Sequence, residues 1–152
     1  MQTFICDNIE NEITQMLHYK NNPQLSCPGL TDERKRYLVC GQPGIGKEDQ
    51  LIAIFKRENA PTHELWVKES VDETVGRIQA LELRPDDILV IRNVELLTHM
   101  LEHPIVRKFA LQLSLIDNYI VAISNVFFKP SAFYNQFQIK IGMTLPPQSY
   151  IE

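Results

Sequence analysis

The stretch that decides the fold of this chain is Gly41-Gln42-Pro43-Gly44-Ile45-Gly46-Lys47. It follows the apolar run Tyr37 to Cys40, which is typical of a short buried strand, and it precedes residues 47–58, whose apolar side chains share one face of a predicted helix. In this setting the stretch matches the first seven positions of the pattern G-x-x-x-x-G-K-[ST]. Its glycines let successive backbone N–H groups point into one concavity, where Lys47 can reach the outer phosphates of a ligand. The sequence therefore predicts a phosphate-binding loop; the simpler alternative is a glycine-rich turn with a solvated lysine.

The eighth position departs from this pattern, because Glu48 stands where a Ser or Thr hydroxyl normally contacts a magnesium ion. Asp49 adds a second carboxylate, and two like charges about 4 Å apart at an effective dielectric constant near 20 repel by on the order of 4 kcal/mol. Two alternatives stay open: Glu48 is itself a magnesium ligand, or both carboxylates only complement the helix dipole. We expect ATP or ADP to bind weakly, Mg²⁺ to contribute little, and Lys47 to project into solvent. The predicted cofactor-binding residues are Gly41, Gln42, Pro43, Gly44, Ile45, Gly46, Lys47, Glu48 and Asp49.

Outward from this loop, strand-sized apolar runs alternate with amphipathic stretches. An opening helix is predicted from apolar residues at helical spacing, namely Ile9, Ile13, Met16 and Leu17. The predicted strands are residues 37–40, 65–67, 88–91, 119–123 and 137–141. Strands of continuous Ile, Leu and Val between helices are typical of a mostly parallel sheet covered on both faces. We therefore expect a three-layer α-β-α fold.

Length, composition and net charge narrow the classes of protein to which this chain can belong. The chain has 152 residues, 44% of them hydrophobic and 22% charged, which is typical of one globular domain. We expect an N-terminal helix and loop at residues 1–36, an α/β core at 37–145 and a polar tail at 146–152. The net charge of −4 gives no support to a nucleic-acid backbone as partner. The cysteines lack metal-ligand spacing, and the apolar runs fall far short of the roughly 20 residues of a membrane span, so we expect an intracellular protein, cytoplasmic or nuclear, without a membrane partner.

The order of these motifs resembles the AAA/AAA+ P-loop ATPase family. The resemblance rests on Asn22-Pro23 after the opening helix, on residues 37–47 and on the closing run Phe137 to Ile141, and it extends from about residue 9 to residue 146. It covers the large nucleotide-binding subdomain of that family and not the helical lid that normally follows. What the resemblance implies is a five-stranded parallel sheet in the order 5-1-4-3-2, with ATP at the mouth of the first strand.

The resemblance also marks positions at which this chain differs from active ATPases. Arg92-Asn93 follow the third predicted strand where the family carries Asp-Glu, and an arginine does not deprotonate to act as a base. Glu95, one turn further on, is the candidate replacement base. Asn125, after the fourth strand, matches the polar residue with which the family senses the terminal phosphate and water. Asn135-Gln136 stand where the family places arginines that reach into a neighbouring subunit.

Together these changes indicate a degenerate ATPase domain, a nucleotide-binding structural or regulatory member of a larger assembly with little or no hydrolysis. One alternative is an active ATPase that uses Glu48, Asp49 or Glu95 for metal and base chemistry, and another is a nucleic-acid remodelling subunit of the loader type. We expect a protein partner or self-association, because aromatic side chains are the usual anchors of interfaces. The predicted anchors are Phe127, Phe128, Phe133 and Tyr134, which alternatively pack into the core.

Overall fold

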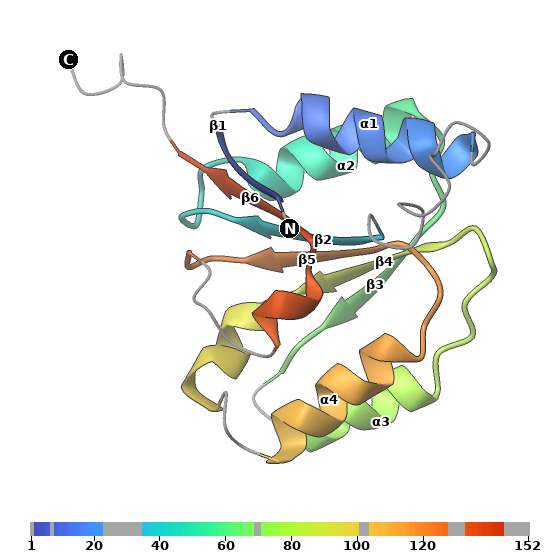
Figure 1. The fold of residues 1–152 in the computed structure, drawn as a ribbon, viewed down its shortest axis with the longest axis vertical. Coiled ribbons are helices and arrows are strands. Elements are labelled where there is room, and N and C mark those ends of the chain that lie inside the picture. Colours follow the sequence, from blue (N-terminus) through green and yellow to red (C-terminus); the bar gives the residue numbers. More distant parts are fainter. Residues whose placement is uncertain are drawn as a thin grey trace.

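A parallel β-sheet forms the middle layer of the molecule, with helices on both of its faces (Figure 1). The computed structural model describes residues 2–6, 8–22, 35–68, 71–100, 104–127 and 133–144. Within these ranges the strands are β1 (Gln2–Cys6), β2 (Arg36–Cys40), β3 (Thr62–Trp66), β4 (Ile88–Arg92), β5 (Ile120–Ser124) and β6 (Ile139–Met143). The α-helices are α1 (Glu10–Asn21), α2 (Lys47–Arg57), α3 (Val71–Gln79) and α4 (Pro104–Ser114), and the 3-10 helices are η3 (Val94–Met100) and η4 (Tyr134–Gln136).

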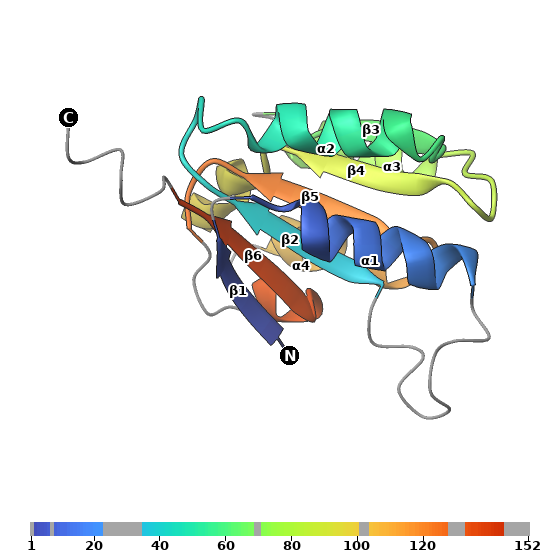
Figure 2. The same cartoon turned by 90° about the horizontal axis from the view of Figure 1, so that it is seen from above.

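The sheet of the described residues has six strands in the order β1-β6-β2-β5-β4-β3, with every neighbouring pair parallel (Figure 2). The prediction of a five-stranded sheet is therefore wrong, because β1 adds a strand outside β6. Phe4 and Cys6 of this strand pack on the core beside α1, which explains why a stretch expected to lead into the helix is extended instead. The other strands lie in the relative order that was predicted for them.

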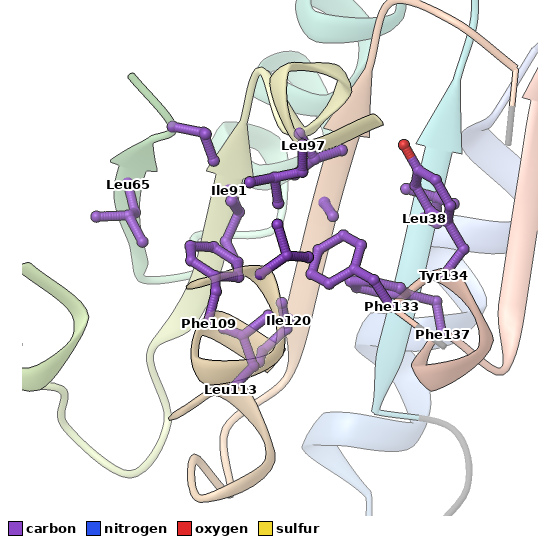
Figure 3. Packing of buried hydrophobic residues seen from close by; sticks show 14 of the residues in the cluster. Leu38, Leu65, Ile91, Leu97, Phe109, Leu113, Ile120, Phe133, Tyr134 and Phe137 are labelled. Carbon is purple, nitrogen blue, oxygen red and sulfur yellow. The ribbon is translucent and has the colours of Figure 1, made fainter. Parts of the chain in front are cut away.

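Two hydrophobic cores separate the sheet from its helical layers. One core lies between the sheet and α1 with α2, and its fully buried members include Ile9, Ile13 and Met16. The other lies on the opposite face, against α3, α4 and both 3-10 helices (Figure 3). None of the helices formed by the described residues is long and apolar enough to span a bilayer.

The predicted aromatic loop divides between core and surface. Phe133 and Tyr134 are buried, and the Phe133 ring lies 5.7 Å from Phe109 and 5.6 Å from Phe137 between centroids, so the expectation that both residues anchor an interface is wrong (Figure 3). The short 3-10 helix η4 turns both side chains inward. Phe127 is 42% exposed, whereas Phe128 and the predicted tail at 146–152 lie outside the described residues.

Candidate nucleotide-binding site

The glycine loop joins the carboxyl end of β2 to the start of α2. It is anchored at its base by a hydrogen bond from Gly41 N to the Ser124 carbonyl (3.1 Å), and a turn inside the loop is closed by Ile45 N donating to the Gln42 carbonyl (3.2 Å). Gly44 and Gly46 have φ angles of 82° and 99°, in the left-handed region that favours glycine. Since residues 42–44 are exposed, the loop presents its backbone to solvent beside the amino end of α2.

Lys47 is the main departure from the expected loop, because its side chain is fully buried. Its ammonium group donates to the Asn125 Oδ1 atom at 2.8 Å and to the Gln42 carbonyl at 3.3 Å, and it lies 3.0 Å from Glu48 Oε1. The ammonium group thus has two hydrogen-bond acceptors and one ion-pair partner within the chain. The expectation that Lys47 projects into solvent is wrong, since Asn125 and Glu48 draw it inward.

Glu95 and Asn125, the two candidate catalytic residues, lie in contact. The Asn125 side-chain amide donates to Glu95 Oε1 at 3.0 Å, and its backbone N–H donates to Glu95 Oε2 at 3.4 Å. The 3-10 helix η3 starts two residues after β4, which brings Glu95 back to the carboxyl end of β5. The result is one polar chain, from Glu48 through Lys47 and Asn125 to Glu95.

Arg92, which stands where the resemblance implies a metal-binding aspartate, lies away from the glycine loop. Arg92, at the end of β4, lies with its guanidinium carbon 4.0 Å from the centre of the Trp66 ring and its Nη1 atom 3.7 Å from Glu64 Oε1. It therefore belongs to the β3 edge of the sheet rather than to the glycine loop. Among the described residues, no group of three His, Cys, Asp or Glu side chains is placed to hold a metal ion. Asp49 is exposed.

A cavity of about 560 Å³ adjoins the site between α2 and strands β3 and β4. Its floor is apolar, formed by Leu51, Phe55 and Val90, and Glu48 and Arg92 both line it. Its size is ordinary for a small-molecule site. It lies along the side of α2 rather than over its amino end.

A buried hydroxyl group lies just beneath the polar chain. Burial raises the pKa of Tyr134 to about 12; the nearby Cys40 and Glu95 add to the rise, whereas a hydrogen bond with Ser124 opposes it. Tyr134 is therefore a neutral donor at any physiological pH. The sequence offered no signal for this placement, because Tyr134 reaches the site across the core from η4.

Solved structures with the same architecture place this geometry in a known fold. The structure of C. elegans PCH-2 superposes with a TM-score of 0.59 over 89% of this chain and 42% of that chain, at 14% sequence identity. The Thermotoga maritima RuvB Holliday junction branch migration motor gives a TM-score of 0.53 over 89% of this chain and 44% of that chain, at 17% identity. The fold is that of an AAA+ P-loop ATPase. No protein-family model and no curated protein sequence matches the chain.

The AAA+ fold explains where the polar chain lies. In parallel α/β sheets, ligands bind outside the carboxyl ends of the strands, and here the glycine loop, Glu95 and Asn125 all meet at that edge. The chain spans less than half the length of either AAA+ neighbour. Asn135, at the position expected for an arginine, is exposed on η4.

Proposed function

We propose that this chain is a nucleotide-binding domain that holds ATP or ADP weakly, hydrolyses it little or not at all, and serves as a structural or regulatory member of a larger assembly. The observation that carries the proposal is the burial of Lys47 against two hydrogen-bond acceptors and the Glu48 carboxylate. A phosphate oxygen must displace one of these acceptors to bind the ammonium group. Where the displaced partner is the Glu48 carboxylate, the exchange gains little free energy, because one anion replaces another.

The backbone of the loop suits a phosphate group, whereas its side chains do not. Gly44 and Gly46 have the conformations that open the loop backbone, and its exposed N–H groups adjoin the amino end of α2. Glu48, however, opposes an anion. Bound nucleotide would be held mainly by these backbone groups, with Lys47 joining only where Glu48 releases it.

Magnesium has no evident place in this arrangement. Glu48 is paired with Lys47, and Arg92 occupies the position at which the AAA+ resemblance calls for an aspartate. A divalent ion at the loop therefore meets the Glu48 carboxylate, which is already paired with Lys47, and the Glu95 carboxylate, which already accepts from Asn125. We propose that binding proceeds without a metal ion.

The test compares two substitutions that remove the same charge one residue apart. Glu48→Gln removes the ion pair with Lys47, whereas Asp49→Asn removes a carboxylate that is exposed. Calorimetric titration with ATP should show a gain of about tenfold or more for Glu48→Gln, which corresponds to about 1.4 kcal/mol, and less than about threefold for Asp49→Asn. Equal gains would mean that only net charge matters, and no gain in either would mean that the loop does not bind phosphate.

An active ATPase is the second candidate, and one observation favours it. Glu95 Oε1 is held 3.0 Å from the Asn125 amide, so a carboxylate does lie at the carboxyl edge of the sheet beside the glycine loop. A phosphate-release assay on the full chain separates the two candidates. Turnover that is lost in Glu95→Gln, with ATP affinity unchanged, would favour the ATPase; no turnover above the buffer rate favours the binding domain.

The role in an assembly is proposed from two features. The matched region makes up less than half of each of the two AAA+ chains, in which this fold occurs together with further sequence. Several large apolar side chains are also exposed, among them Leu111 at 59% and Leu115 at 73%, next to one another on and just beyond α4. Such surfaces often mark contacts with other proteins.

A further inference from the structure

The strand β1 forms one edge of the sheet, and its outward-facing backbone groups can be assigned. Among the described residues, β1 pairs with β6 alone. The Cys6 carbonyl accepts a hydrogen bond from Thr144 N at 2.8 Å, so the backbone of Cys6 faces the sheet interior. Because backbone groups alternate in direction along a strand, Phe4 faces inward as well, and Thr3 and Ile5 direct their N–H and C=O groups outward.

The two edges of the sheet differ in their protection against further pairing. At the opposite edge, β3 carries Glu64, which is 44% exposed in its side chain, and the Arg92 guanidinium lies within ion-pairing range of it. Charges on an edge strand are a common defence against pairing with another chain. The residues of β1, Gln2 to Cys6, include neither a charge nor a proline. Within the described part of the chain, β1 is therefore the edge that is open to another strand.

An apolar surface adjoins this open edge. Ile5 is 61% exposed and Phe127 is 42% exposed, and both lie over Gly142 of β6. A methyl group added at Gly142 would lie 2.8 Å from Ile5 Cδ1 and 2.7 Å from Phe127 Cε1, so the glycine is what lets these side chains rest on the strand. Val126, 43% exposed, extends the surface. The edge thus combines exposed apolar area with backbone groups that have no partner strand in residues 2–6, 8–22, 35–68, 71–100, 104–127 and 133–144.

We propose that β1 pairs antiparallel with β1 of a second copy of this chain, joining the two sheets into one. The register that pairs every residue of the strand is centred on Phe4. It places Thr3 opposite Ile5 of the second copy in hydrogen-bonded pairs, and it places the two Phe4 rings side by side across the two-fold axis. Each copy supplies the same groups, as an isologous interface requires.

A second copy fits this edge better than a charged partner. The chain carries a net charge of −4, so most faces of two copies repel one another. β1 is neutral and lets two copies meet without placing like charges opposite one another. The inference goes beyond the proposed nucleotide binding and does not depend on it, because neither Lys47 nor the glycine loop takes part.

Sedimentation of the full chain without nucleotide tests the pairing. The wild-type chain should be a dimer, and Ile5→Lys should be a monomer with an unchanged circular dichroism spectrum, because each lysine replaces an apolar side chain opposite Thr3 and the two like charges come close to the two-fold axis. Thr62→Lys is the matched control, since it puts the same side chain at an exposed position on the β3 edge, and it should remain a dimer. A monomeric wild-type chain, or a dimer that Ile5→Lys leaves intact, would overturn the proposal.

Cross-linking tests the register without disturbing Phe4. In a background in which Cys6 and Cys27 are replaced by serine, Ile5→Cys and Thr3→Cys chains should form a disulfide when mixed and oxidised, because hydrogen-bonded pairs have Cα atoms about 5.5 Å apart. Neither variant alone should cross-link, since like positions are then separated by about 8 Å or more. Cross-linking of either variant alone would overturn the register, and no cross-link in any sample would overturn the pairing.

Discussion

At the scale of single residues, the burial of Lys47 changes what its removal should do. The Asn125 amide oxygen and the Gln42 carbonyl would lose their donor, and Glu48 would lose its counter-ion. A buried polar group left without a partner costs about 1 to 3 kcal/mol. We therefore expect Lys47→Ala to lower the free energy of unfolding by about that amount in urea titrations. Lys56→Ala, an exposed lysine on the same helix, should change it by less than about 0.5 kcal/mol. Equal effects of the two variants would contradict the network.

Tyr134 gives a second residue-scale prediction, at alkaline pH. Its pKa is raised from 10.0 to about 12, so the folded state holds the phenolic proton more tightly than the unfolded state does. Stability should therefore be unaffected below pH 10 by this group and should fall as the pH rises through the window between these two values. The loss from Tyr134 is about 1 kcal/mol by pH 11. Tyr134→Phe removes it, so the unfolding free energy of this variant should decline less between pH 9 and pH 11 than that of the wild type. Parallel declines would show that the hydroxyl group ionises as it does in water.

The sequence could predict the site only where its parts are local. The glycine loop was found because its residues are consecutive and lie between a strand and a helix. The pairing of Lys47 with Asn125 joins residues far apart in the chain, and nothing in either neighbourhood signals it. Glu95 looked displaced by one turn from a useful position, and the 3-10 helix η3 removes that displacement.

At the scale of elements, the aromatic residues before and within η4 should contribute unequally to stability, because some are buried and one is exposed. Phe133 packs on Phe109, Tyr134 and Phe137, and it is 2% exposed. Phe133→Ala should lower the free energy of unfolding by about 3 to 5 kcal/mol through lost burial and the cavity left behind. Phe127→Ala removes the same ring from an exposed position before that helix and should cost less than about 1.5 kcal/mol. Urea titrations of both variants measure the difference, and similar losses would place Phe127 in the core as well.

Elements could be predicted from the sequence where their burial requires a continuous apolar run. Strands β4 and β5 are buried along nearly their whole length and were found within one residue at each end. β1 was missed because it lies at a sheet edge, where a strand needs little apolar sequence, and its Phe4-Ile5-Cys6 is too short to distinguish from a helix lead-in. Its pairing with β6 joins the two ends of the described chain, a contact that no local pattern encodes.

At the scale of the whole molecule, the parallel sheet carries a glycine loop whose lysine, Lys47, is bound by other groups of the same chain. The two cores, the strand order and the glycine turn have the AAA+ architecture, and the proposed loss of metal binding rests on Glu48 and Arg92 alone. The structural requirements of the fold and the chemical requirements of hydrolysis are met by different residues. The proposed loss of hydrolysis would therefore leave the fold intact.

The magnesium dependence of ATP affinity tests this account most directly. Calorimetric titration of the wild-type chain with ATP, once with magnesium and once with excess chelator, compares the same loop with and without the metal ion. Since Lys47 is paired with Glu48 and Arg92 lies at the β3 edge, the two dissociation constants should be weak and should agree within about threefold. Tight binding that falls by about a hundredfold or more on chelation would contradict the account, because it would require a metal site that this arrangement of Glu48 and Arg92 does not provide.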